Sequence, residues 1–111
     1  MYIESTDVIN VSHTEYSPRD LAVIDIEAYH IARAELSLAQ GAICRTFDTS
    51  EESGKYLAEL RGAQKGLRDR ARAAVGVLAA GDCGKLALLG RELMGEASAG
   101  SVRERLDQLT I

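Results

Sequence analysis

Glu27 and His30 are the first residues whose types and spacing suggest a specific chemistry. In di-iron carboxylate bundles, a Glu-x-x-His pair points two metal ligands from one helix into the bundle core. On a helical wheel, however, this pair lies on the side away from the apolar stripe described below, and the chain holds no second Glu-x-x-His. We therefore interpret Glu27 and His30 as a solvated acid and histidine, and we predict no metal site.

The two cysteines do not form a nucleophilic site with either histidine. Cys44 and His30 lie fourteen residues apart on one predicted helix, which separates them by about 21 Å and prevents the hydrogen bond that activates a thiol. Neither Cys44 nor Cys83 belongs to a Cys-x-x-Cys pair, so we interpret both as buried small residues in a reducing compartment. Residues 81–85 lack the spacing of a phosphate-binding loop. These patterns predict no enzyme activity and no cofactor.

Four basic residues form the most regular surface pattern in the chain. Their steps of four, three and four place them within about 60° on one flank of a helix. The four are Arg61, Lys65, Arg68 and Arg72. Such a stripe can bind an acidic protein or a phosphate backbone. Alternatively, it covers a hydrophobic seam and pairs with Asp20, Glu27 and Glu35 of the preceding helix.

Composition places the chain among ordinary globular domains. Its 111 residues are 46% hydrophobic, enough to bury one core without a metal or disulfides. The net charge of -4 argues weakly against broad affinity for nucleic acid. The first residues lack the features of a secretory signal, and no apolar run approaches the roughly 20 residues of a membrane span. We expect one cytoplasmic domain with no membrane contact.

Capping patterns predict a chain made of helices. Ser17 followed by Pro18 is typical of a helix start, and Thr49 with Glu52 forms a capping box that opens a second long helix. Gly81 is suited to the left-handed conformation after that helix. We predict an all-α fold in which an extended arm at 1–16 precedes a helical domain at 17–111, with helices at about 18–45, 50–80, 84–97 and 102–109.

Apolar residues in steps of three and four predict that the two long helices form an antiparallel hairpin. The stripe on the first helix comprises Leu21, Ile24, Ala28, Ile31, Leu38 and Ala42, with Glu35 as its polar break. The stripe on the second comprises Leu57, Leu60, Gln64, Leu67, Ala71, Ala74 and Leu78. Antiparallel pairing brings both polar breaks to one level, so we predict that Glu35 meets Gln64 in the seam between the helices.

The second long helix also has a face of small residues away from its leucine stripe. These residues are Gly62, Gly66, Ala73 and Val77. Each glycine costs about 1 kcal/mol of helix stability relative to alanine. Two glycines on one face therefore favour close packing against the shorter helices or a second copy of the chain, and we predict self-association.

We interpret the chain as a small acidic helical module for protein–protein interaction. It would bind a protein partner of unknown identity and form a homo-oligomer. Proteins of this size and class include secretion chaperones, assembly factors and phage inhibitors of host defence such as anti-CRISPRs, so an adaptor, chaperone or inhibitor role is expected by analogy. The alternative is a regulator that binds nucleic acid through the basic stripe.

Overall fold

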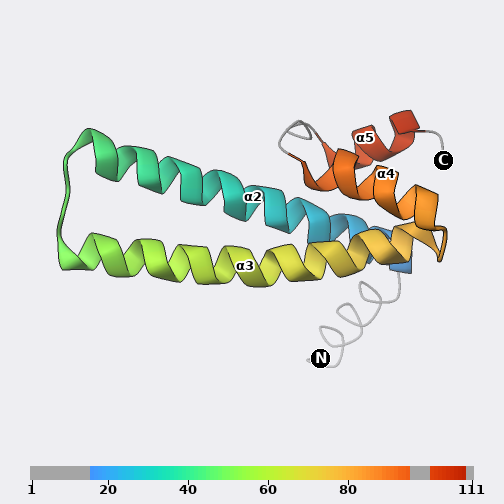
Figure 1. Ribbon diagram of the computed structural model, residues 1–111, viewed down its shortest axis with the longest axis horizontal. Helices are drawn as coiled ribbons and strands as arrows, with labels where there is room; N and C mark the ends of the chain where they lie inside the picture. The colour runs from blue at the N-terminus through green and yellow to red at the C-terminus, as the bar shows by residue number, and fades with distance from the viewer. Residues whose placement is uncertain (1–15, 96–100, 110–111) are drawn as a thin grey trace, which may run out of the picture.

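The computed structural model describes residues 16–95 and 101–109. Every regular element in these ranges is an α-helix, which confirms the predicted all-α class. The helices are α2 (Pro18–Arg45), α3 (Glu51–Ala79), α4 (Cys83–Met94) and α5 (Val102–Leu109) (Figure 1). α4 therefore ends at Met94, before the predicted end near residue 97. The predicted arm at 1–16 lies outside the described residues, apart from Tyr16.

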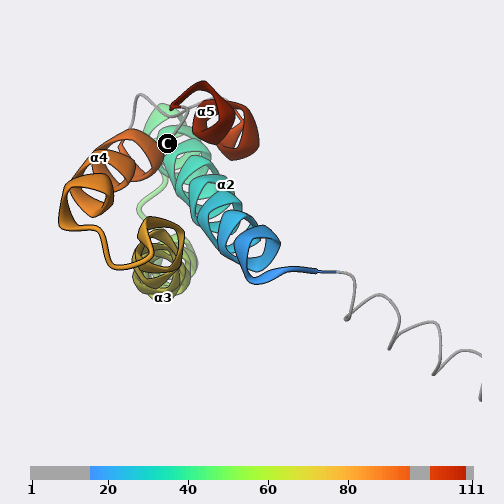
Figure 2. The same cartoon turned by 90° about the vertical axis from the view of Figure 1, so that its right-hand side faces the viewer.

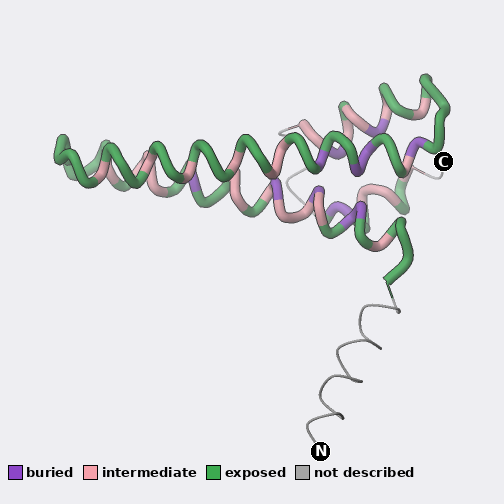
Figure 3. The backbone as a smooth tube through the Cα atoms, turned by 90° about the horizontal axis from the view of Figure 1, so that it is seen from below, coloured by how far each residue is buried: buried purple, intermediate pink, exposed green. Residues whose placement is uncertain are grey.

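α2 and α3 are antiparallel neighbours, as predicted, and residues 46–50 join them at one end of the hairpin (Figure 1). α4 and α5 pack at the opposite, open end (Figure 2). The half of the hairpin nearest the turn extends past both short helices. Fully buried side chains accordingly concentrate where the four helices meet (Figure 3). The largest are Val23, Ile26, Leu89, Leu93 and Val102.

Local capping determines where the helices begin. Ser17 Oγ accepts the Asp20 N–H at 3.1 Å, and the Asp20 carboxylate accepts the Ser17 N–H at 3.3 Å. This confirms the predicted start of α2 at Pro18. The prediction that Thr49 caps the next helix is wrong, because Ser50 Oγ accepts the Ser53 N–H at 3.2 Å. Asp48 accepts the Ser50 N–H at 2.8 Å and thereby shifts the cap by one position.

The predicted buried face of α2 is wrong. Leu21, Ile31 and Leu38 are 52%, 67% and 72% exposed, and Glu35 is exposed as well. The core instead uses the opposite arc of the helix, which includes Ala22, Val23, Ile26, Tyr29 and Leu36. The physical reason is that α2 contacts α3, α4 and α5. A helix with three neighbours buries a broad arc, whereas a heptad stripe is wide enough for only one neighbour.

The predicted stripe of α3 is confirmed. Every member is buried or half-buried, including Gln64. The predicted contact between Glu35 and Gln64 is not formed in the seam, because Glu35 lies on the exposed side of α2 and Gln64 lines a hollow with Leu36. The predicted antiparallel pairing of the helices is therefore confirmed. The predicted rotation of α2 about its own axis is wrong, because α2 buries a different face from the one that the residue spacing indicated.

Ser17→Ala should lower stability and alter its pH dependence. The hydrogen bonds from the Ser17 side chain and backbone hold the pKa of Asp20 below its ordinary value, with a smaller effect from Arg103. A carboxyl whose pKa is lowered by folding stabilises the protein above its unfolded pKa of about 4, and this contribution is lost as the pH falls. Loss of the cap should cost about 1 kcal/mol near neutral pH and less in acid.

Urea unfolding at about pH 7 and about pH 3 measures both effects. Ser37→Ala is the matched control, because Ser37 is exposed within α2 and caps no helix. Equal losses from Ser17→Ala at both pH values would contradict the assigned link between Ser17 and Asp20.

Candidate interaction surfaces

Glu27 and His30 are half-buried packing residues, so the prediction that both are solvated is wrong. Arg103 Nε of α5 lies 3.9 Å from Glu27 Oε1. His30 Nε2 hydrogen-bonds the Leu93 carbonyl of α4, and since a carbonyl only accepts, Nε2 carries the proton. The pair therefore fastens α2 to both short helices. Within residues 16–95 and 101–109, no group of three or more His, Cys, Asp or Glu is arranged to hold a metal ion.

Arg33 adds a second contact at the end of α4. Its guanidinium donates to the Met94 carbonyl at 3.1 Å and to the Tyr29 hydroxyl at 3.4 Å, and it lies 5.5 Å from the centre of the Tyr29 ring. His30 and Arg33 together satisfy two carbonyls that the end of a helix leaves without partners. Neither role could be predicted, because nothing in the sequence indicates which helix end lies beside these residues.

The basic stripe does not pair with α2. Arg61, Lys65 and Arg72 are exposed, and Arg68 is half-buried with a buried Nε that has no hydrogen-bond partner. The ion pairs among the described residues use none of the four. Arg103 of α5 takes Asp20 and Glu27 instead, at 3.6 and 3.9 Å. The alternative in which the stripe pairs with acids of the preceding helix is therefore wrong within the described chain.

A hollow of about 650 Å³ lies between the two long helices beside the end of α4. The residues lining it are His30, Arg33, Ala34, Leu36, Ser37, Gln40 and Gln64. Gln64 lies three residues after Arg61 and four before Arg68, so all three are surface neighbours on α3. The hollow and the basic stripe therefore adjoin.

The outer face of α2 is an apolar surface that the short helices leave uncovered. We define it by four exposed side chains: Leu21, Ile24, Ile31 and Leu38. Ile24 is the least exposed of them, at 37%. At its start, Leu21 shares a hollow of about 350 Å³ with Ala73 and Val77 of α3. Two of the predicted self-association residues thus adjoin this outer face.

Gly62 and Gly66 lie on open helix surface. A Cβ atom added at either position would meet nothing within 4 Å, so neither glycine packs against α4 or α5. Of the partners that the sequence suggested for this face, the two short helices are thereby excluded at Gly62 and Gly66, whereas Val77 shares a hollow with residues of α4 and α5. A second copy of the chain is the partner that stays as a prediction.

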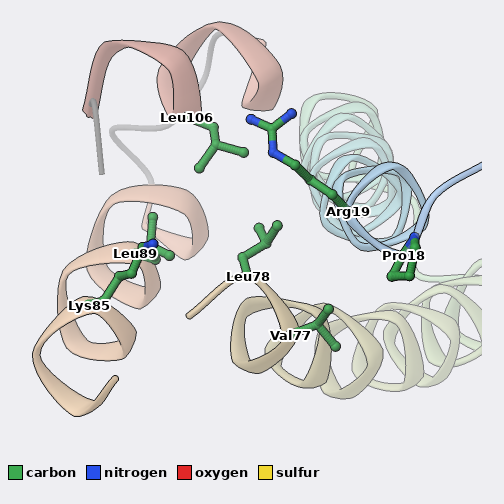
Figure 4. Close-up of a pocket in the computed structure, with 7 residues that line it drawn as sticks. All are labelled: Pro18, Arg19, Val77, Leu78, Lys85, Leu89 and Leu106. Atoms are coloured by element: carbon green, nitrogen blue, oxygen red, sulfur yellow. The ribbon is translucent and has the colours of Figure 1, made fainter. Parts of the chain in front are cut away.

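A smaller hollow of about 340 Å³ lies where all four helices meet (Figure 4). Its lining combines apolar side chains, including the fully buried Leu89, with the cations Arg19 and Lys85. Arg19 Nη2 lies 3.6 Å from Asp107 Oδ1, so Arg19 already forms an ion pair between α2 and α5. This hollow belongs to the junction that holds the helices together.

Cys44 and Cys83 are both free and exposed, which corrects the prediction that they are buried core residues. Cys44 lies in the last turn of α2, and Cys83 is the first residue of α4. None of the helices in the described ranges combines the length and apolar character needed to cross a membrane.

Comparisons with protein-family models, curated proteins and solved structures find no match for this chain.

Proposed function

We propose that this protein is a helical protein–protein interaction module that self-associates through the outer face of α2. The observation that supports it is the exposure of Leu21, Ile24, Ile31 and Leu38 in steps of three and seven along one line of the helix. Residues spaced in this way form the contact stripe of a coiled coil. From Leu21 to Leu38 the stripe extends about 25 Å, enough for a second helix to lie along it.

Burial of this stripe supplies the driving force. Full burial of a Leu or Ile side chain stabilises by about 1.5–3 kcal/mol, and each protomer of a symmetric pair contributes the same four residues. The gain must exceed the cost of association, about 4–15 kcal/mol. Ala73 and Val77 enlarge the apolar surface beside Leu21, which brings part of the predicted self-association face into the same contact.

Charge favours an antiparallel arrangement of the two α2 helices. A parallel pair would bring Glu35, which lies within the stripe, against its own copy. An antiparallel pair can place Leu21 of each copy opposite Leu38 of the other, and Ala28 opposite Ile31, so that Glu35 faces Ile24. Asp20 and Glu27 of each copy then lie beside Ala39 and Ala32 of the other, so the acids of the two copies avoid one another.

Adaptor, chaperone and inhibitor are the roles that fit such a module, and we propose a cytoplasmic, non-enzymatic function on the same grounds of class. The second candidate is a regulator that binds nucleic acid. The specific observation in its favour is that the basic stripe of α3 has no acidic partner among the described residues.

Light scattering and sedimentation should give a mass of twice the 12.0 kDa chain at micromolar concentration. Ile31→Glu should convert the protein to a monomer, because it places a charge in the middle of the stripe, and its helix content should not change because residue 31 is exposed. Leu86→Glu is the control, since Leu86 is 44% exposed on α4. A wild-type monomer, or dissociation by both variants alike, would refute the proposal.

A further inference from the structure

The half of the hairpin nearest the turn at 46–50 carries a second surface, on the side where α4 packs. α4 stops at Met94, where His30 and Arg33 bond the last carbonyls. The same two side chains line the hollow of about 650 Å³. α4 thus lies beside the hairpin up to this point, and among the described residues no further helix lies beside α2 and α3 between there and the turn (Figure 1). The groove is the hollow between α2 and α3 at this place.

This groove is positively charged although the chain as a whole is negative. Arg33 lines the hollow, Arg61 and Arg68 are surface neighbours of Gln64 in that lining, and the lining contains no Asp or Glu. No described acid forms an ion pair with any of these cations.

The lining of the hollow is mixed. Leu36 is buried and Ala34 is apolar, and the other lining residues are polar, namely His30, Arg33, Ser37, Gln40 and Gln64. A ligand that fits therefore offers apolar side chains to Leu36 and Ala34 and negative charge to the rim. An amphipathic helix with acidic residues beside its apolar face has both features.

We propose that this groove, with the basic stripe as its rim, binds an acidic amphipathic helix of a partner protein, which lies along the hairpin where α4 leaves off. The site is distinct from the outer face of α2, so it goes beyond the proposed self-association. Nucleic acid fits less well. His30 has the one aromatic ring among the residues lining the hollow, and its hydrogen bond to the Leu93 carbonyl already holds that ring in the packing of α4, while the stripe from Arg61 to Arg72 extends only about 16 Å.

Fluorescence anisotropy with three labelled probes tests the proposal. The first is a synthetic helix with leucines in steps of three and four and glutamates beside them, the second has lysines in place of the glutamates, and the third is a DNA duplex. The glutamate helix should bind the full chain, and the other two should not. Arg61→Glu with Lys65→Glu should weaken binding about tenfold or more. Lys55→Glu with Arg91→Glu is the control of equal charge, because both positions are exposed and neither lines the hollow, and it should bind as the wild type does.

Ile31→Glu separates this site from the outer face of α2. Binding of the glutamate helix that persists in this variant supports the groove, even if the wild type proves monomeric. Binding that Ile31→Glu abolishes would assign the probe to the outer face and overturn the proposal. Absence of binding by the glutamate helix, or salt-sensitive binding of the DNA duplex that Arg61→Glu with Lys65→Glu removes, would overturn it as well.

Discussion

Leu93→Ala should destabilise the protein by about 2–5 kcal/mol, a large share of the stability of a small domain. Leu93 is fully buried where α4 meets the hairpin, and its carbonyl accepts the hydrogen bond from His30. Truncation leaves a cavity in a core that has few large side chains. Most of the buried residues of α3 are alanines, namely Ala71, Ala74 and Ala79, and these cannot move to fill the space.

Urea unfolding followed by circular dichroism measures this loss, and Leu86→Ala is the matched control. Leu86 lies on the same helix and is 44% exposed, so its truncation should cost well under 1 kcal/mol. Because Leu93 lies far from the outer face of α2, the folded fraction of Leu93→Ala should keep the mass of the wild type. A small loss of stability would show that α4 is not packed on the hairpin as described.

Glu35→Leu should tighten self-association by roughly tenfold to a hundredfold. Glu35 occupies the single polar position in the stripe of α2 and is exposed in the protomer. A leucine there adds apolar surface to the proposed contact in both copies, and each copy gains about 1 kcal/mol or more on burial. The folding of the protomer gains little, because the position is exposed in the protomer.

Sedimentation over a dilution series gives the dissociation constants for this comparison. Arg91→Leu is the control, since it adds a leucine at an exposed position of α4, away from the stripe. Equal tightening by the two variants would indicate unspecific hydrophobic association. A Glu35→Leu variant that is less stable than the wild type would instead restore a buried role for Glu35 in the seam with Gln64.

Much of the local structure of this protein is determined by sequence alone. The start of α2 depends on Ser17, Pro18 and Asp20, which act within one turn, so it could be predicted from their order. The buried face of α3 was also predictable. Its stripe contains four of the large apolar residues of that helix, and apart from Tyr56, Val75 and Val77 the positions outside the stripe are small or charged.

The sequence left the buried face of α2 undecided, because that helix has apolar residues on two opposite sides. Leu21, Ile31 and Leu38 form the more regular stripe, whereas Val23, Ile26 and Tyr29 belong to the broader arc. Only the tertiary structure selects between them. Contact with α3, α4 and α5 at once buries the broad arc, which no single neighbour could cover, and leaves the regular stripe outside.

The candidate surfaces depend on the same selection. The spacing of the basic stripe was visible in the sequence, but its lack of acidic partners was not, because Arg103 of α5 takes Asp20 and Glu27. The groove beside it exists because α4 ends at Met94, where His30 and Arg33 meet its last carbonyls. Contacts between residues more than sixty positions apart in the chain have no signature in local spacing, so only packing of the helices could reveal them.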